Sequence, residues 1–319
     1  MRRSVKLLAG AHSDPHTMFT RNRAPQKRLA QEPHFFSYGT LERHTADLNC
    51  GRVRYLRHGA GTPLLLVHGV PTSARLWEPL LGHLGAHYDC IVPDLLGLGC
   101  SEPASDGTDV ASPGQADMLA QLLDALGVDQ CFAVFHDQGG AHGMEMLRRH
   151  GARIDKVVFT NCVCYDNWPV PLIDMSAVMA RSGALPWLAK LRLMQWTLRL
   201  ALPMTITRGP FPAALREDWF RALDVGGPAL EYWQRYVTAQ SARYTQEAVE
   251  VLRAWDKPAH VLWAADDRFL PPSWAAYLAK DLVGSEANPE LLPFAGHFWQ
   301  IEVPESGAAA LHRFFSTAH

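Results

Sequence analysis

Short runs of consecutive hydrophobic residues alternate with longer amphipathic stretches along most of the chain. From Leu41, the stretch LERHTADLNCGRVRYLRHG predicts two strands joined by a turn at Asn-Cys-Gly. Six more strand-like runs follow, separated by segments with the apolar spacing of helices. These runs are TPLLLVHG, YDCIVPD, QCFAVF, DKVVFTNC, PAHVLWAADD and ELLPF. Strands that are apolar along their length are buried on both faces, so the pattern predicts an α/β fold with a mostly parallel eight-stranded sheet flanked by helices.

The alternation stops between residues 165 and 254, where Trp, Leu, Met and Pro dominate helix-like runs without a strand signal. This segment is typical of an inserted helical cap. The α/β core would then consist of residues 34–164 and 255–319. Residues 1–33 are basic and irregular, which predicts a disordered extension, with Met18 as an alternative start of the protein.

One apolar segment of the cap, ALPWLAKLRLMQWTLRLALPM, raises the question of membrane contact. Lys190, Arg192 and Arg199 interrupt it and prolines bound it, so it is too broken to span a bilayer. A helix lying on a membrane surface has the same general character. We favour a cap helix that covers an apolar pocket, and we expect no membrane partner.

Composition and charge narrow the function classes further. The 319 residues are 48% hydrophobic and 19% charged, which excludes a disordered or fibrous chain. The net charge is -2 without a basic block, so we expect no nucleic-acid partner. Six scattered cysteines show neither a disulfide framework nor zinc-ligand spacing, and the N-terminal apolar patch is too short for a secretory signal. These features predict a cytoplasmic protein with free thiols.

Asp137 stands between a strand-like run and a run with helical spacing. The run QCFAVF ends directly before His136 and Asp137, and GGAHGMEMLRRH continues with helical spacing. Asp137 is therefore predicted on a sharp turn between a strand and a helix. The positive end of that helix would favour the ionised carboxylate.

Five motifs in order make the chain resemble the α/β-hydrolase family over about residues 41–316. The motifs are HGVPTSARLW, PDLLGLGCSEP, HDQGG, WAADDRFLPP and AGHFW. The resemblance implies this fold and a nucleophile, an acid and a histidine in chain order, which correspond to Asp137, Asp267 and His297.

Two carboxylates compete for the role of the acid. In the family pattern the acid stands four residues before a proline, and Pro271 selects Asp267 by this spacing. We expect Asp266 to cap the following turn. A rival acid after the DKVVFTNC strand, as in some relatives, is disfavoured because Asn161 occupies that position and does not ionise.

An aspartate nucleophile indicates attack on saturated carbon. A serine attacking such a carbon would leave an ether, which water activated by a histidine does not cleave. Asp137 would instead form an ester, which water activated by His297 can hydrolyse. The resemblance implies that the backbone amides of Val70 and Gln138 stabilise the oxyanion. The predicted substrates are small apolar alkyl halides, haloacids or epoxides, with water as co-substrate and no metal or cofactor.

The motifs HGVPTSARLW and PDLLGLG resemble those of haloalkane dehalogenases, which also tolerate a bulky apolar residue where Phe135 stands. The chain departs from them at the halide site, because Gln138 and Val70 stand where those enzymes usually have Trp and often Asn. Gln138 could donate from its side-chain amide, and Trp168 or Trp187 of the cap could supply an indole N–H. The oligomeric state is left open.

Two alternatives remain. Epoxide hydrolases protonate the opening alkoxide with cap tyrosines, and Tyr232 and Tyr236 stand at i and i+4, although both could simply be packing residues. A non-catalytic receptor for a small ligand could use the same scaffold. Arg follows the nucleophile in fluoroacetate-type dehalogenases, and Gln138 does not match this.

Overall fold

The computed structural model describes most of the chain from residue 37 to residue 317. The described residues are 37–169, 171–184, 187, 190, 196, 200–286 and 288–317. The predicted extension at residues 1–33 and most of the apolar segment 184–204 lie outside the described residues, so these two predictions are not tested.

A mixed sheet of nine strands forms the centre of the described fold. Its order is β1-β2-β4-β3-β6-β7-β8-β9, with β5 paired to β2. The strands are β1 (His44–Leu48), β2 (Gly51–His58), β3 (Thr62–Val67), β4 (Tyr88–Pro93), β5 (Glu102–Pro103), β6 (Cys131–Asp137), β7 (Ile154–Cys162), β8 (Ala259–Ala264) and β9 (Glu290–Leu292). The parallel part runs from β4 through β3 to β9, and β1, β2 and β5 pair antiparallel. All eight predicted strands are confirmed, whereas the two-residue β5 is too short to give a periodic signal.

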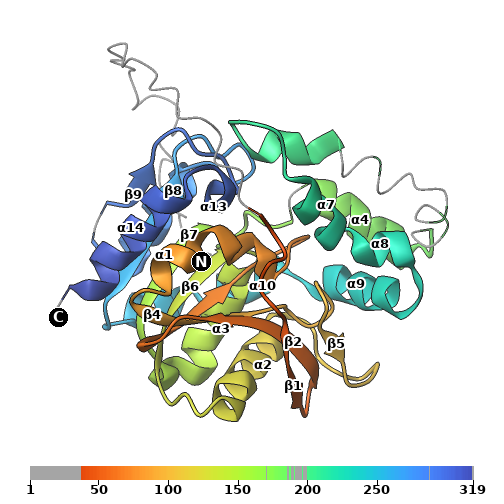
Figure 1. Ribbon diagram of the computed structural model, residues 1–319, viewed down its shortest axis with the longest axis horizontal. Helices are drawn as coiled ribbons and strands as arrows, with labels where there is room; N and C mark the ends of the chain where they lie inside the picture. Colours follow the sequence, from red (N-terminus) through yellow and green to blue (C-terminus); the bar gives the residue numbers. More distant parts are fainter. Residues whose placement is uncertain are drawn as a thin grey trace, which may run out of the picture. The chain divides into compact units, whose positions relative to one another are not determined.

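Helices cover both faces of this sheet (Figure 1). Helix α1 packs against α14 on one face, and α2 packs against α3 on the other. The helices of the core are η2 (Ala74–Trp77), α1 (Glu78–Leu84), α2 (Ser112–Ala125), α3 (Gly139–His150), η3 (Gly151–Arg153), α12 (Ser273–Asp281), α13 (Trp299–Glu302) and α14 (Pro304–Ser316).

The segment between β7 and β8 contains helices and no strand within its described residues. Its helices are α4 (Pro171–Arg181), η4 (Leu202–Thr205), α7 (Ala213–Trp219), α8 (Arg221–Val225), α9 (Gly227–Ala239), α10 (Ala242–Glu247) and α11 (Val249–Ala254). Helix α9 packs against both α4 and α8, as the green and cyan ribbons of Figure 1 show. The described residues of this segment thus contain helices without a strand, and α10 and α11 also pack against α3 of the core.

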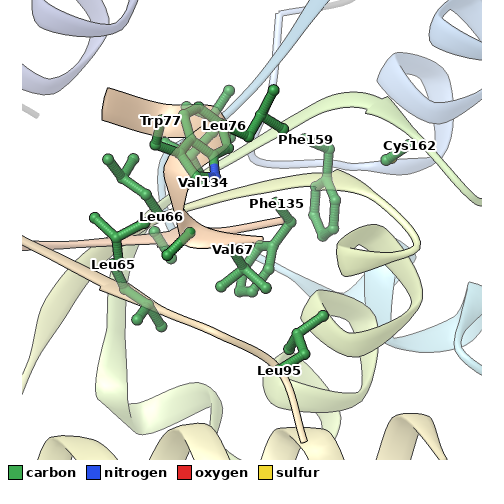
Figure 2. Close-up of a cluster of buried hydrophobic side chains, with 14 of the residues drawn as sticks. Leu65, Leu66, Val67, Leu76, Trp77, Leu95, Val134, Phe135, Phe159 and Cys162 are labelled. Carbon is green, nitrogen blue, oxygen red and sulfur yellow. The ribbon is translucent and has the colours of Figure 1, made fainter. Parts of the chain in front are cut away.

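A dense apolar cluster lies beneath the turn at the end of β6, with Phe135 and Phe159 side by side (Figure 2). Their ring centroids are 5.7 Å apart. A Cβ atom on Gly143 of α3 would lie 2.4 Å from the Phe135 ring. The bulky residue two positions before Asp137 is thus accommodated because the facing helix carries no side chain there.

A buried arginine joins three segments that are far apart in sequence. Arg43 Nε lies 3.0 Å from Asp94 Oδ2, and its NH2 lies 3.0 Å from Asp218 Oδ1. Asp94 belongs to the loop after β4 and also accepts hydrogen bonds from the backbone amides of Ala74 and Cys100. Since Asp218 belongs to α7, Arg43 ties the insertion to the core.

Replacing Arg43 by methionine should therefore destabilise the fold. The Asp94 side chain is fully buried, so loss of the arginine leaves an uncompensated charge. We expect Arg43→Met to lower the free energy of unfolding by about 2–4 kcal/mol in urea denaturation. The matched control is Arg52→Met, which removes an exposed ion pair with Asp47 and should cost less than about 1 kcal/mol. Similar losses in both variants would contradict a structural role for the Arg43 pair.

Two further features concern the cysteines and the possibility of a membrane-spanning helix. All six cysteines are free, in agreement with the predicted free thiols. Within the residues that the structure describes, none of the helices combines the length and the apolar character needed to cross a bilayer.

Candidate active site

Asp137 occupies a strained turn at the end of β6, directly before α3. Its φ is 54°, a left-handed conformation that is uncommon for residues other than glycine. The backbone amide of Val163 donates to the Asp137 carbonyl at 2.8 Å and helps to fix this turn. A Cβ atom on Gly69 would lie 2.1 Å from Asp137 Oδ1, so only glycine allows the loop after β3 to approach the carboxylate.

The two carboxylate oxygens of Asp137 have different partners. Oδ1 accepts a hydrogen bond of 2.7 Å from the backbone amide of Val70. Oδ2 lies 3.3 Å from His297 Nε2. The amide nitrogen of Gln138 lies beside Gly69, 2.4 Å from the Cβ position that glycine leaves empty. The two amides expected for an oxyanion hole therefore sit on the Oδ1 side, and Val70 already donates to that oxygen.

His297 and Asp267 form the second half of the arrangement. His297 lies in the loop after β9, and its Nδ1 is 2.9 Å from Asp267 Oδ2. Asp267 follows β8, and its Oδ1 accepts the backbone amides of Phe269 and Leu270 at 2.8 and 2.9 Å. The three residues selected from the sequence are thus brought together by the carboxyl ends of β6, β8 and β9.

Asn161 stands at the position where some relatives have the acid, and here its side chain forms a hydrogen bond with Asp267. Asn161 Nδ2 donates to Asp267 Oδ2 at 2.7 Å, and Asn161 Oδ1 accepts the Ala264 amide at 2.9 Å. Asp266 was expected to cap the turn that follows it. This expectation is wrong, because Asp267 itself accepts the amides of the turn and Asp266 is exposed.

Burial and charge act together on these groups. The His297 and Asp267 side chains are 4% and 0% exposed, and Asp137 is the most accessible of the three at 10%. Burial alone would lower the pKa of His297, but the charges of Asp267 and Asp137 and their hydrogen bonds raise it to about 10. Burial alone would raise the pKa of Asp267, but His297, Asn161 and the Leu270 amide bring it below its usual value. The two carboxyl groups that flank His297 therefore favour the protonated form of its ring.

This charge state gives stability a specific pH dependence. The folded-state pKa of His297, about 10, lies above its unfolded value of about 6.5. The stabilisation is complete below about pH 6.5 and is lost as the pH rises towards 10. Compared with His297→Gln, the wild-type protein should lose relative stability across this window, by at most roughly 1.4 kcal/mol per pH unit. Denaturant unfolding at pH 6, 7, 8 and 9 measures this difference, and a constant difference would mean that folded His297 is neutral.

The residues predicted to contact the leaving group differ in how far they are exposed. Trp168 is buried in the apolar core, whereas Trp187 is 69% exposed with Lys190 over its ring. The structure thus gives no support to Trp187 as a donor in the site. Tyr232 is half-buried and Tyr236 is fully buried, both on α9.

Gln138, the nearest predicted donor, is fully buried. Its side-chain Nε2 donates to Gln240 Oε1 at 3.4 Å, and its own Oε1 is unpartnered among the described residues. Gln138 is thus linked to the end of α9, because Gln240 follows that helix directly.

Two buried histidines next to the site escaped the sequence analysis. His136 precedes Asp137, and its Nε2 lies 3.0 Å from the backbone carbonyl of His297. His142 of α3 contacts the Tyr236 hydroxyl at 2.8 Å. The only local signal was their position within the HDQGGAH stretch, because nothing in the sequence identifies their partners.

The site consists of the protein's own acid, base and amide groups. Among the described residues, no cluster of three or more His, Cys, Asp or Glu side chains has the arrangement of a metal site.

Similarity to known proteins agrees with this architecture. Residues 62–189 match the model of the α/β-hydrolase fold family. Cis-3-alkyl-4-alkyloxetan-2-one decarboxylase of Shewanella oneidensis is 35% identical over 137 residues, which are 41% of this chain and 43% of that protein. The matched segment thus spans less than half of the decarboxylase. Haloalkane dehalogenase 2 of Mycobacterium tuberculosis is 26% identical over 272 residues, 83% of this chain and 92% of that protein.

A solved structure is similar over nearly the whole fold. An α/β-hydrolase fold protein from Burkholderia ambifaria superposes with a TM-score of 0.72 at 24% identity, covering 85% of this chain and 99% of that one. This likeness concerns the fold alone. The chain thus has the α/β-hydrolase fold, and haloalkane dehalogenases are among the proteins to which it is similar.

Proposed function

We propose that this protein is a hydrolase that uses Asp137 as its nucleophile and forms an alkyl ester at a saturated carbon. The observation that carries the proposal is that the two carboxylate oxygens of Asp137 have different partners. Oδ1 accepts the Val70 amide at 2.7 Å, whereas Oδ2 lies 3.3 Å from His297 Nε2. This leaves Oδ2 as the attacking oxygen and Oδ1 as the oxygen that becomes the oxyanion.

The first step would displace a leaving group from the substrate. A lone pair of Asp137 Oδ2 attacks the carbon, and the bond to the leaving group breaks with its electron pair. Asp137 becomes a neutral ester. The Val70 amide remains aimed at Oδ1, where charge develops again in the second step.

Formation of the ester would also lower the pKa of His297, so that its ring can act as the base in the second step. Two of the causes that raise the pKa of His297 are the charge of Asp137 and its hydrogen bond, and both disappear when the carboxylate is esterified. The imidazolium can then release its proton, and neutral His297 can take a proton from water as that water attacks the ester carbonyl. Asp267, with Asn161 behind it, keeps the ring in place and stabilises the returning imidazolium.

Dehalogenase-like cleavage of a small apolar substrate is the reaction that we favour. A dehalogenase relative matches 92% of its own length to this chain, and the segment between β7 and β8, which we take as a cap, is helical in its described residues. We propose that this cap, residues 165–254, supplies apolar contacts to the substrate. Trp168 and Tyr236 are buried residues of this segment, and the buried Gln138 of the core donates to Gln240 at the end of α9.

A product screen tests the proposal. Purified protein would be incubated with chloro-, bromo- and iodoalkanes of two to twelve carbons and with matched terminal epoxides, and released halide and diol would be measured. Release of halide supports the dehalogenase-like function, and diol formation supports the epoxide hydrolase alternative. Saturable binding without any product in protein with intact Asp137 would instead favour a non-catalytic receptor.

The decarboxylase relative suggests a second candidate, which is cleavage of a β-lactone. It is 35% identical over 137 residues. Asp137 could attack the saturated ring carbon of an oxetan-2-one, and the ring carboxylate would be the leaving group. Loss of CO₂ from this intermediate would form an alkene and regenerate the Asp137 carboxylate without water. Incubation with a cis-3,4-dialkyloxetan-2-one distinguishes the candidates. Decarboxylation of this lactone releases CO₂ and an alkene, whereas hydrolysis of the same lactone releases a hydroxy acid.

His136 should matter for the second step only. Burial and then the charge of His297 lower the pKa of His136 to about 3, so its ring is neutral. Its Nε2 donates to the His297 carbonyl at 3.0 Å and so holds the loop that carries the base. We expect His136→Leu to slow ester hydrolysis by roughly 10–10²-fold while ester formation changes little.

The matched variant is His136→Gln, whose side-chain amide can reach the same carbonyl and should restore hydrolysis. Rapid-quench mass spectrometry resolves the two steps. If both steps slow equally in His136→Leu, or if glutamine restores nothing, His136 has only a packing role.

A further inference from the structure

A chain of buried polar side chains connects α3, which begins beside the nucleophile, with α9 of the insertion. His142 Nε2 lies 2.8 Å from the Tyr236 hydroxyl, and His142 Nδ1 lies 3.1 Å from Ser112 Oγ. Ser112 Oγ and Gln138 Nε2 lie 3.3 and 3.4 Å from Gln240 Oε1. All five side chains belong to residues that are at most 7% exposed, so their hydrogen bonds must be made within the protein.

The direction of each proton follows from Gln240. Its Nε2 donates to the backbone carbonyls of Val110 and Tyr236 at 2.9 and 3.1 Å. The amide oxygen therefore faces Ser112 and Gln138, and an amide oxygen can only accept. The single hydroxyl proton of Ser112 goes to Gln240, so Ser112 Oγ must accept from His142 Nδ1.

These contacts leave one position for the proton on the His142 ring. Burial, followed by the charge of His68, lowers the pKa of His142 to about 3, so the ring is neutral and carries one proton. With this proton on Nδ1, Nε2 is an acceptor for the Tyr236 hydroxyl. The opposite tautomer would draw the Ser112 proton away from Gln240 and leave the Tyr236 proton without an acceptor in the network. Burying a donor without an acceptor is unfavourable, which favours the first arrangement.

We propose that His142 determines which leaving groups the Asp137 site accepts. By holding the Tyr236 proton, it restricts the site to substrates whose leaving group departs as a stable anion, such as a halide or a carboxylate, and disfavours epoxides. The inference rests on the proposed role of Asp137 as nucleophile. The hydrogen-bonded chain from Tyr236 ends at Gln138, the residue directly after Asp137, and the charge of Asp137 contributes, after burial, to the raised pKa of the Tyr236 phenol.

The electron balance of the first step explains the selection. With a halide or a carboxylate, the electron pair of the broken bond leaves on a stable anion, so the negative charge moves from Asp137 to the leaving group and no proton is needed. An opening epoxide produces an alkoxide, which needs a proton as it forms. Tyr236 could supply this proton only by turning it away from His142, and the phenolate would then face the lone pair of Nε2 instead of a donor.

Nitrogen-15 NMR of the histidine rings tests the hydrogen-bond assignment in the wild-type protein without any substrate. We expect His142 to carry its proton on Nδ1 and to accept at Nε2, with its signals assigned by their absence in His142→Leu. A proton on Nε2 would overturn the inference. Because this measurement does not depend on turnover, its failure is distinguishable from failure of the proposed function.

Covalent labelling tests the consequence. Ester formation would be followed by mass spectrometry in a His297→Gln background, with 1-bromohexane and 1,2-epoxyhexane as probes. We expect an adduct from the bromide and little or none from the epoxide. Adding His142→Leu should raise the ratio of epoxide to bromide labelling rates by roughly 10²-fold, since the phenol proton becomes available.

Two further variants identify the acid. Tyr236→Phe should remove the gained epoxide labelling, and Tyr232→Phe should retain it. Rapid epoxide labelling while His142 is present, no gain in a folded His142→Leu protein, or loss of the gain only in Tyr232→Phe would each overturn the inference. If neither probe labels Asp137, the proposed function is contradicted, and the NMR result alone decides the assignment of the His142 proton.

Discussion

Replacing His297 by glutamine should trap the enzyme as a covalent ester. The imidazole Nε2 lies 3.3 Å from Asp137 Oδ2 and is assigned to the activation of water, so its removal leaves the attack by Asp137 possible. We expect alkylation of Asp137 to proceed while hydrolysis of the ester slows by roughly 10²–10⁴-fold or more. Intact-protein mass spectrometry should show one substrate-derived adduct per chain, and peptide mapping should place it on Asp137.

The matched control for this experiment is Asp137→Asn in the same background, which should form no adduct. An adduct on another residue, or full turnover without His297, would contradict the proposed mechanism. Retained turnover restricted to oxetan-2-ones, with release of CO₂, would instead support the lactone candidate, because that route does not require an activated water.

Replacing Asp267 by asparagine should have the next largest effect. Asp267 Oδ2 accepts from His297 Nδ1 at 2.9 Å, and its charge is the main favourable contribution to the raised pKa of the ring. The neutral amide removes this charge and can present an N–H to the ring. We expect turnover to fall by roughly 10²–10⁴-fold, with ester hydrolysis more affected than ester formation.

Asp266→Asn provides a control at the neighbouring position, since Asp266 is exposed and makes no contact with His297 among the described side chains. Its turnover should stay within about twofold of the wild-type value. Rapid-quench measurement of both steps compares the two variants. A larger loss in Asp266→Asn would show that the spacing to Pro271 selects the wrong carboxylate.

Much of the candidate site was predictable because its residues occupy fixed places on the sheet. Asp137 ends a strand that is recognisable as an apolar run, and Asp267 and His297 each follow such a strand. Parallel strands bring their carboxyl ends to one edge of the sheet. The role of Asn161 could not be predicted in the same way. Its position suggested a lost acid, whereas its amide donates to Asp267 from 106 residues away.

The leaving-group side of the site was the least predictable part. The sequence indicated Trp187 and Tyr236 by residue type alone. Trp187 is 69% exposed, and the Tyr236 hydroxyl is engaged with His142, which is 94 residues away. Which donor faces a leaving group depends on how the insertion packs on the core, and no periodic pattern records that packing.

The sequence by itself determined the α/β class, the succession of the eight main strands along the chain and the aspartate at the end of β6. Apolar periodicity and turn residues act over a few neighbouring positions, so they can be read without the fold. Only the tertiary structure decided that Arg43 would pair with Asp218, that Asn161 would support Asp267, and that His142 would hold the Tyr236 proton. These contacts join segments 94 to 175 residues apart, and their geometry is fixed by the packing of side chains that the local pattern does not specify.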